Sequence, residues 1–547
     1  MTLPKYYLLL LLSCFLLSES SWATTYYFHP KLGNDQNVGT SPLTPFQSLN
    51  RIQTLSLAAG DSILLAAGRV FAGSLELKGQ SGSKENPIVI TSYDLGPPRL
   101  SHLAQINAQA HPNGILLRDC SFVEVSNLHI TADGGVMPAD IVSTMRCGVL
   151  VQISEVGTYE GITLSGLQIE DVFFEDEGFE RGKSEVRTAN GTQSYGWGIR
   201  FINRVEGALL KDILVENCQI TNVAHTGIKL TGRNRSITDL RIYDCKVLSA
   251  GGPGMQMSGV VRGHVARNYV SRSGSPDDSR KWGRGSGLWT WGSADILIEK
   301  NQFLHANGPG DSAGCHIDFN CENIVVQYNY SAHNAGGFCE ILGNNYNCAY
   351  RYNISFNDGH RVKGKNGAFQ EGKTFWLSGF AGKKKKRTGP FNSYFYNNTI
   401  IVGKDIVSKM AIDRAAKGIL IMNNIFYIQG KSQLVLGDQY RPATEGASAI
   451  EEVVFKNNLY LQPDNWPKDI MIQDEEPIIG DVGFSWSEEL DFYAYLPKHP
   501  AMVKDKGLEI PRIPLDKIGL TIGLKVQYDF LGRKIVGKPD LGAIEVK

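Results

Sequence analysis

The stretches "ILIEKN" (296–301) and "IVVQYN" (324–329) decide the fold. Each runs through alternating apolar residues and ends on an asparagine, and the pattern returns along the chain with closest spacings of 23 to 28 residues. Longer gaps between copies indicate inserted loops. The asparagine falls at Asn127, Asn268, Asn301, Asn329, Asn353, Asn398, Asn424 and Asn458, and Cys218 and Cys245 take its place in two copies. The chain is therefore built from a repeat.

A repeat of this length, rich in Val, Ile, Tyr and Asn and without long amphipathic helices, is typical of a solenoid of parallel strands. Alternation places every second residue of a strand in a narrow core. Asparagines at one turn of successive coils can stack into a ladder, in which each amide bonds to the backbone of the next coil. A β-propeller would need larger and more even repeats. We therefore expect an all-β, parallel β-helix with long loop insertions.

A second column of the repeat places side chains on the outside of the coils. It starts at a glycine, as in "GIKL" (227–230) and "GLWTW" (287–291), and its flanking apolar residues are expected to point inward. The outward position is then held by Leu116, Leu150, Arg200, Lys229, Gln256 and Trp289. In the next two coils the alternation predicts Ile317, Phe319, Cys339 and Ile341 inside, and His316, Asp318, Phe338 and Glu340 outside.

Two acidic residues on this face suggest a catalytic pair. Aligned on their shared Ala-Gly, "SAGCHIDFN" (312–320) and "NAGGFCEIL" (334–342) place Asp318 and Glu340 at the same position, 22 residues apart. If 22 residues make one circuit, the two carboxylates lie roughly 5 Å apart on adjacent coils. Their repulsion would raise one pKa. That spacing suits a retaining glycosidase, with Asp318 as nucleophile and Glu340 as acid/base.

Other residues near the pair are candidates for substrate binding. Trp289 and Trp291 share one face and could stack on a sugar ring. The remaining candidates are Arg200, Lys229, Gln256, His305, His316, His333, Arg361 and Lys363. Lysine, arginine and histidine would equally serve the alternative, a polysaccharide lyase that removes the proton beside a uronate carboxylate. In that case Ca²⁺ could bind at Asp318 and Glu340. A non-catalytic glycan-binding solenoid is a further alternative.

The two ends of the chain resemble a known family. The N-terminal "YYFHPKLGNDQNVGTSPLTPFQSLNRI" (26–52), "GDSILLAAG" (60–68) and "NPIVITSYD" (86–94), with the closing "DFLGRKIVGKPDLGAIEVK" (529–547), are similar to secreted right-handed parallel β-helix proteins of the pectin-lyase-like superfamily. The resemblance implies a carbohydrate-active protein and a capping helix, here Phe46–Leu55. It is specific for the fold and leaves the substrate open.

The division of the chain follows from these signals. Residues 1–23 carry Lys5, an apolar run and the small-x-small end Ser21–Ala23, which predict a cleaved signal peptide; a lipoprotein at Cys14 is the alternative. Residues 24–547 are expected to form one domain: 24–110 as N-terminal cap and first coils, 111–460 as central coils with the groove, and 461–547 as C-terminal coils and cap. The protein is expected to be secreted or periplasmic.

Composition narrows the partners. Lysine plus arginine equals aspartate plus glutamate, so the zero net charge gives no sign of nucleic-acid or membrane binding. Beyond Cys14, the eight cysteines show no metal-ligand spacing. We expect a monomer that acts on a polysaccharide or oligosaccharide, without a firmly indicated cofactor. The basic run "GKKKKR" (382–387) would attract an acidic glycan.

Overall fold

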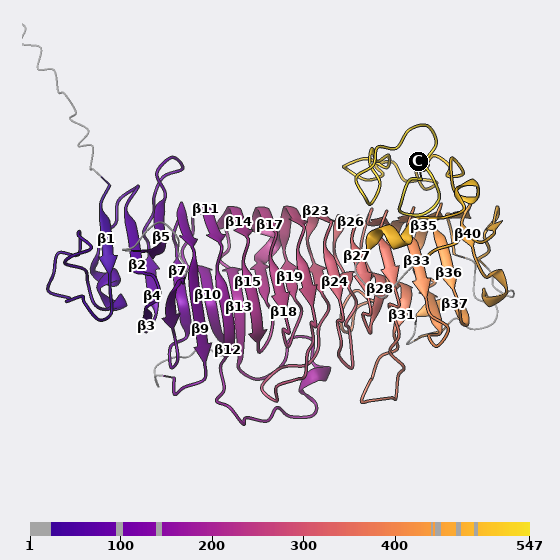
Figure 1. Cartoon of the computed structure of the whole chain (residues 1–547). Coiled ribbons are helices and arrows are strands. Elements are labelled where there is room, and N and C mark those ends of the chain that lie inside the picture. Colours follow the sequence, from indigo (N-terminus) through magenta and orange to yellow (C-terminus); the bar gives the residue numbers. More distant parts are fainter. Residues whose placement is uncertain are drawn as a thin grey trace, which may run out of the picture.

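The computed structural model of the protein describes residues 23–94, 102–137, 145–438, 441–442, 450–466, 472–485 and 491–546. The predicted signal segment, apart from its last residue, and Cys14 lie outside the described residues. The described chain winds into a long solenoid. Strands of successive coils stack side by side and so build three long sheets (Figure 1). Neighbouring coils pair in parallel throughout the central region, which confirms the expected parallel β-helix.

The strands alternate between the three sheets along the chain. Sheet I comprises β1 (Thr25–Phe28), β2 (Ser62–Ala66), β5 (Ile88–Tyr93), β8 (Val123–Ser126), β11 (Thr158–Ser165), β14 (Leu209–Glu216), β17 (Ile237–Tyr243), β20 (Val260–Ala266), β23 (Ala294–Glu299), β26 (Glu322–Gln327), β29 (Ala349–Arg351), β32 (Phe391–Tyr396), β35 (Lys417–Met422) and β39 (Val453–Lys456). Sheet II comprises β4 (Leu75–Lys78), β7 (Asn113–Arg118), β10 (Met145–Ile153), β13 (Tyr195–Asn203), β16 (Ile228–Gly232), β19 (Met255–Ser258), β22 (Leu288–Trp291), β25 (Cys315–Ile317), β28 (Gly337–Ile341), β31 (Lys373–Leu377), β34 (Ser408–Ile412), β37 (Ser432–Asp438) and the antiparallel β38 (Arg441–Pro442). Sheet III comprises β3 (Val70–Ala72), β6 (Ala104–Asn107), β9 (Leu128–Asp133), β12 (Gln168–Phe173), β15 (Gln219–Val223), β18 (Lys246–Leu248), β21 (Tyr269–Ser271), β24 (Gln302–Leu304), β27 (Tyr330–Ala332), β30 (Ile354–Phe356), β33 (Thr399–Val402), β36 (Ile425–Ile428), β40 (Leu459–Tyr460) and β41 (Ile478–Ile479).

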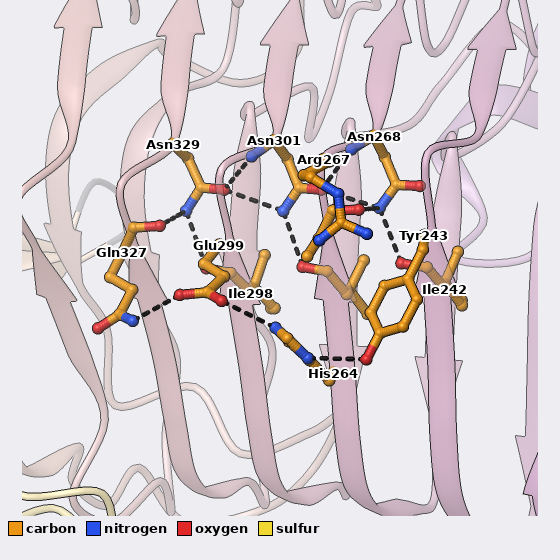
Figure 2. A network of polar contacts seen from close by, with 12 residues as sticks. Ile242, Tyr243, His264, Arg267, Asn268, Ile298, Glu299, Asn301, Gln327 and Asn329 are labelled. Atoms are coloured by element: carbon orange, nitrogen blue, oxygen red, sulfur yellow. Dashed lines mark hydrogen bonds and ion pairs between the residues drawn. The ribbon is translucent and has the colours of Figure 1, made fainter. Parts of the chain in front are cut away.

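The predicted asparagine ladder fills the turn between sheets I and III (Figure 2). The backbone N–H and the side-chain amide of Asn268 both donate to Asn301 Oδ1 at 2.9 Å, and Asn301 donates to Asn329 in the same way. The ladder continues through Asn353, Asn398, Asn424 and Asn458 to Asp474. Each amide thereby satisfies buried backbone groups that the turn would otherwise leave without partners.

Two cysteines and one asparagine refine this picture. Cys218 and Cys245 occupy the ladder position, as predicted, and their thiols contact buried carbonyl oxygens. Asn127 does not join the ladder, which corrects the prediction. It follows the inward Val125 by two residues, whereas Asn301 follows Ile298 by three. Asn127 instead takes the left-handed turn position, at a φ of 52°, where its short polar side chain is tolerated.

The N-terminal cap is smaller than expected. The predicted helix Phe46–Leu55 is a 3-10 helix, η1 (Leu49–Thr54). Leu49 and Ile52 of η1, with Phe46 before it, are buried in the main core and cover its open end.

The other 3-10 helices are η2 (Glu185–Arg187), η3 (Arg233–Arg235), η4 (Pro463–Asn465), η5 (Phe492–Tyr495) and η6 (Pro500–Met502). Within the described ranges no helix is long and apolar enough to span a membrane.

The C-terminal segment folds back on the solenoid. Beyond β41 the described residues add no further strand to the coils, so the coils expected within 461–547 reduce to that one short strand. Residues 508–535 pack instead against the outer face of sheet I, where their apolar side chains cover Tyr328, Tyr352, Tyr394 and Tyr396. In Figure 1 these irregular yellow loops lie beside β26 and β35. The eight described cysteines are all free and buried.

Candidate active site

The outward positions of sheet II line up in a continuous column. Strand register places Leu116 beside Leu150 and then in turn Arg200, Lys229, Gln256, Trp289 and His316. Glu340 and Trp376 continue this first column. The predicted outward column from Leu116 to Trp289 is therefore confirmed. A second column, two residues further along each strand, contains Thr231, Ser258 and Trp291.

The register of Asp318 and Glu340 differs from the prediction. Ile317 pairs with Ile341, so one circuit takes 24 residues, and Glu340 lies level with His316. The two Ala-Gly pairs are not equivalent, because Ala313 bridges to Gly337, and Gly336 donates instead to the carbonyl of Ser312. The alignment on Ala-Gly was therefore wrong by two residues. Asp318 and Glu340 lie diagonally across adjacent coils, which is a wider separation than direct pairing gives.

Two aromatic residues also depart from the predicted alternation. Phe338 is buried in the core, where its ring meets those of Tyr350 and Phe395, although the pattern placed it outside. Gly337 before it has a φ of 146°, a conformation that a residue with a side chain rarely adopts. Phe319, predicted inside, lies after the end of β25 and packs edge-to-face on Trp291 and Phe380.

The two columns form the floor of a groove with a volume of about 1310 Å³. Arg200, Lys229, Gln256, Trp289, Trp291, His316, Asp318 and Glu340 all line it. Its walls come from inserted loops, at residues 187–195, at Arg284, and at Gln370, Phe380 and Arg387. These loops connect β12 to β13, β21 to β22, β30 to β31 and β31 to β32. Eight of the predicted site residues thus share one cavity.

Three acidic residues of the groove surround His316. The positive charge of a protonated His316 would lower the pKa of Asp311, of Asp318 and of Glu340. Glu340 Oε2 lies 3.8 Å from His316 Nδ1, and Ser286 Oγ lies 3.0 Å from the same nitrogen. Trp289 stacks on the imidazole with 5.4 Å between ring centroids. The histidine therefore stands between an aromatic ring and a cluster of carboxyl groups.

The environments of these carboxyl groups push their pKa values apart. Burial raises the pKa of Asp318 to about 7, and the charges of Glu340 and Asp311 add to the rise. Burial also raises the pKa of Glu340. Burial alone would raise the pKa of Asp311 as well, yet the adjacent Arg284 lowers it overall. The site thus holds one acid that is ionised at neutral pH beside one that keeps its proton up to about pH 7.

Asp311 is the carboxylate that the sequence did not single out. Arg284 donates two hydrogen bonds to its carboxylate, from Nε to Oδ2 at 2.7 Å and from Nη2 to Oδ1 at 3.0 Å. The buried Arg361 donates to the carbonyl oxygens of Gly308 and Asp311 and so holds the loop before β25. Asp311 lies in that irregular loop, where strand alternation gives no orientation. Its position seven residues before Asp318 was the only available signal.

The remaining predicted residues lie away from the groove. His305 and His333 stack on each other, 5.2 Å between ring centroids, at a separate cavity of about 530 Å³ on the sheet III side. They directly follow β24 and β27 of sheet III, where the chain turns before it enters sheet II. Arg361 donates a hydrogen bond to the carbonyl of Asp311 and so holds its loop. Lys363 is exposed in the loop between β30 and β31. In the described part of the chain no group of three His, Cys, Asp or Glu residues is arranged to hold a metal ion.

Several known proteins resemble this chain. The family model for a right handed beta helix region matches residues 197–400, which include most of the groove. A lacto-N-biosidase of Bifidobacterium longum subsp. longum is 24% identical over 632 aligned positions, which cover 96% of this chain. The chain spans 37% of the length of that relative.

Two solved structures match this chain over most of its length. A GH136 lacto-N-biosidase from Eubacterium ramulus matches with a TM-score of 0.49 at 19% identity, over 80% of this chain and 67% of that one. The complex of XylC with xylose matches with a TM-score of 0.48 at 12% identity, over 96% and 98%. At these scores the likeness says nothing of activity. Together with the three parallel sheets, the matching family model identifies the fold as a right-handed parallel β-helix.

Proposed function

We propose that the protein is a glycoside hydrolase that cleaves an oligosaccharide or polysaccharide in the groove of sheet II. The observation that carries this proposal is the pair of acids with separated pKa values, Asp311 and Asp318, in one groove with exposed aromatic rings. A glycosidase needs one carboxyl group that donates a proton and a second that is ionised. The lacto-N-biosidase relative supports the same class of reaction.

The surroundings of Asp311 and Asp318 favour other catalytic roles than those predicted from the sequence, where Asp318 was the nucleophile and Glu340 the acid/base. Asp318, with a pKa of about 7, suits the general acid rather than the nucleophile. In a retaining mechanism Asp318 protonates the glycosidic oxygen as the bond to the anomeric carbon breaks, and an oxygen of Asp311 attacks that carbon. The Asp318 carboxylate then takes a proton from water, which attacks the same carbon and releases Asp311. Arg284 keeps Asp311 ionised for the first step.

The position of Glu340 gives it a different part. It contacts His316 and lies diagonally from Asp318, so it acts on the histidine and on the pKa of Asp318.

The decisive experiment measures turnover of a panel of glycosides by Asp311→Asn, Asp318→Asn and Glu340→Gln. We expect the two aspartate variants to lose activity about 10²- to 10⁴-fold and Glu340→Gln to lose less. Near wild-type turnover in either aspartate variant contradicts the assignment.

The stereochemistry has its own test. The anomeric configuration of the first product, followed by NMR, is expected to match that of the substrate. If the pair acts instead across a wider gap, with a water between, the configuration inverts. Inversion would remove the nucleophilic role of Asp311 but leave it as the base that activates that water.

A polysaccharide lyase remains the second candidate, on one specific observation. Burial, with the neighbouring charges of Arg200 and Arg204, lowers the pKa of Lys229 to about 7. Such a lysine could abstract a proton beside a uronate carboxylate. A lyase product contains an unsaturated uronate that absorbs in the ultraviolet, and a hydrolase product does not. Appearance of that absorbance on uronate polymers would favour the lyase.

The predicted export of the protein is likewise a proposal, supported by residues 1–23 of the sequence. Expression of the full chain in a bacterial host, followed by fractionation and N-terminal sequencing, tests it. We expect a product that starts near Thr24 outside the cytoplasm.

A further inference from the structure

Two buried cations lie side by side at one end of the groove. Arg200 on β13 and Lys229 on β16 are register partners in the first column, and both line the groove. Their exposed fractions are 8% and 7%. Burying a positive charge costs several kcal/mol unless an opposite charge compensates it.

No carboxylate of the described residues pairs with either of them. Arg200 contacts the sulfur of Met145 and the ring of Trp197, whose centroid lies 4.5 Å from the guanidinium carbon. The charged groups that act on Lys229 are Arg200 and Arg204, both positive. Of the other buried cations in the described ranges, Lys281 pairs with Asp277 and Arg284 with Asp311, whereas Arg146 and Arg351 donate hydrogen bonds to several oxygen acceptors. The Arg200–Lys229 pair therefore stands out.

Polar atoms of Arg200 and of two neutral residues beside these cations also lack partners. Arg200 Nε, Thr231 Oγ1 and Gln256 Oε1 are buried and have no hydrogen-bond partner in the described structure. A buried polar atom without a partner costs about 1–3 kcal/mol, so such atoms gather where a ligand supplies the missing bonds. Two cations, a hydroxyl and an amide within three adjacent coils suit a ligand that carries both a negative charge and hydroxyl groups.

The groove ends at this point. Leu116 and Leu150 precede Arg200 in the column, but an apolar cluster that includes Tyr195, Trp197 and Trp282 covers them. Towards the carboxyl groups, three coils separate Lys229 from His316, a rise of about 14 Å. This length exceeds one hexose ring. A ligand that reaches from the acids to the cations is therefore at least a disaccharide, and its end lies at Arg200.

We propose that Arg200 and Lys229 form a subsite for an anionic group, a carboxylate or a sulfate, on the terminal sugar of the glycan. The link to catalysis rests on the proposed hydrolase function, but the binding of the anion does not. The substrate class is then an acidic oligosaccharide bound by its charged end, with the bond to be cleaved one or more residues away.

Binding can be tested without turnover. In the full-length Asp318→Asn protein, calorimetry with glucuronic acid, glucose 6-sulfate and glucose measures the three affinities. We expect at least one of the two anionic sugars to bind at least ~10-fold more tightly than glucose, since a charge-assisted hydrogen bond is worth about a factor of ten or more. The two anionic arms tell a carboxylate from a sulfate.

Substitutions locate the subsite. Lys229→Met and Arg200→Met, each in the Asp318→Asn protein, are expected to lose that preference for the anionic sugar, whereas Lys229→Arg retains it. Lys211→Met, outside the groove on sheet I, is the matched control and should leave it unchanged. Equal affinity for glucose and both anionic sugars, or unchanged preference in Lys229→Met and Arg200→Met, overturns the proposal. Absence of hydrolysis by the wild-type chain would count against the hydrolase function and leave the binding result standing.

Discussion

Glu340 lies level with His316 on the next coil, and 3.8 Å separates Glu340 Oε2 from His316 Nδ1. At its own level of the groove the glutamate thus meets an imidazole and not a second carboxyl group. Asp318 is offset by two residues along the strand, beside the second column. Of the three acids in the groove, Glu340 contacts the histidine and Asp311 is paired with Arg284.

The activity should depend on the protonation of Asp318. As the general acid it works protonated, and burial raises its pKa to about 7, so kcat/KM falls as the pH rises through about 7. A profile from about pH 5 to about pH 9 measures this limb. Asp318→Asn is expected to abolish the limb along with most of the turnover. A wild-type profile without a decline over that range contradicts the role.

The acidic limb of the same profile should depend on Arg284. Arg284→Met removes the charge that lowers the pKa of Asp311, so burial raises that pKa and the loss of activity on acidification begins at higher pH. Arg284→Lys keeps a charge without the paired hydrogen bonds and should shift the limb less. The comparison uses kcat/KM against pH for the three proteins. An unmoved acidic limb in Arg284→Met would show that Asp311 does not titrate in the reaction.

Asp358 should make stability depend on pH. It is fully buried and accepts hydrogen bonds from Asn334 and Ser355, and burial raises its pKa to about 7. The folded state keeps this proton up to about pH 7, while the unfolded chain loses it near pH 4. The free energy of unfolding therefore falls by up to about 4 kcal/mol as the pH rises from about 4 to about 7.

The substitution Asp358→Asn tests this effect. It keeps an oxygen acceptor for Asn334 and removes the ionisation, so its apparent unfolding midpoint at pH 7 should exceed that of the wild type, with little difference near pH 4. Thermal unfolding at both pH values measures the difference. A variant less stable than the wild type at pH 7 contradicts the prediction.

The ladder should carry a large part of the stability of the central coils. Asn301→Ala removes the acceptor of two hydrogen bonds from Asn268 and the donor to Val265, all buried. We expect a loss of at least about 3 kcal/mol in the free energy of unfolding. Asn307→Ala, at an exposed position in the next loop, is the matched control and should change stability little. Similar effects in both would argue against the ladder.

The sequence predicts the fold because one repeat of its apolar pattern corresponds to one coil of the solenoid. Inward apolar residues and buried asparagines recur with each circuit, and the register confirms the outward column from Leu116 to Trp289. The exception at Asn127 arises from a one-residue difference in the distance from the last inward residue. Such differences are visible only when the strand, rather than the asparagine, is aligned.

The candidate site was less predictable, for physical reasons. Strand alternation placed His316 and Glu340 outside correctly, and it failed at Phe338, next to Gly337 with its positive φ. Asp311 lies in a loop, and its ionisation depends on Arg284, which comes from another insert and meets it only in the folded chain. The two-residue shift between Asp318 and Glu340 arises where Gly336 and Gly337 let the backbones approach closely. Small-residue turns of this kind carry no period.

The C-terminal segment gives the molecule an order of assembly. Tyr328 donates a hydrogen bond to the carbonyl of Tyr528, 200 residues later, and Asn347 bonds to Asp516 across 169 residues. These contacts support the coils that follow Asp318 and Glu340. On the ribosome, the coils of the groove emerge long before the segment that covers their outer tyrosines. The coils of the groove can therefore reach their final rigidity only after residues 508–535 have been made and have packed on sheet I.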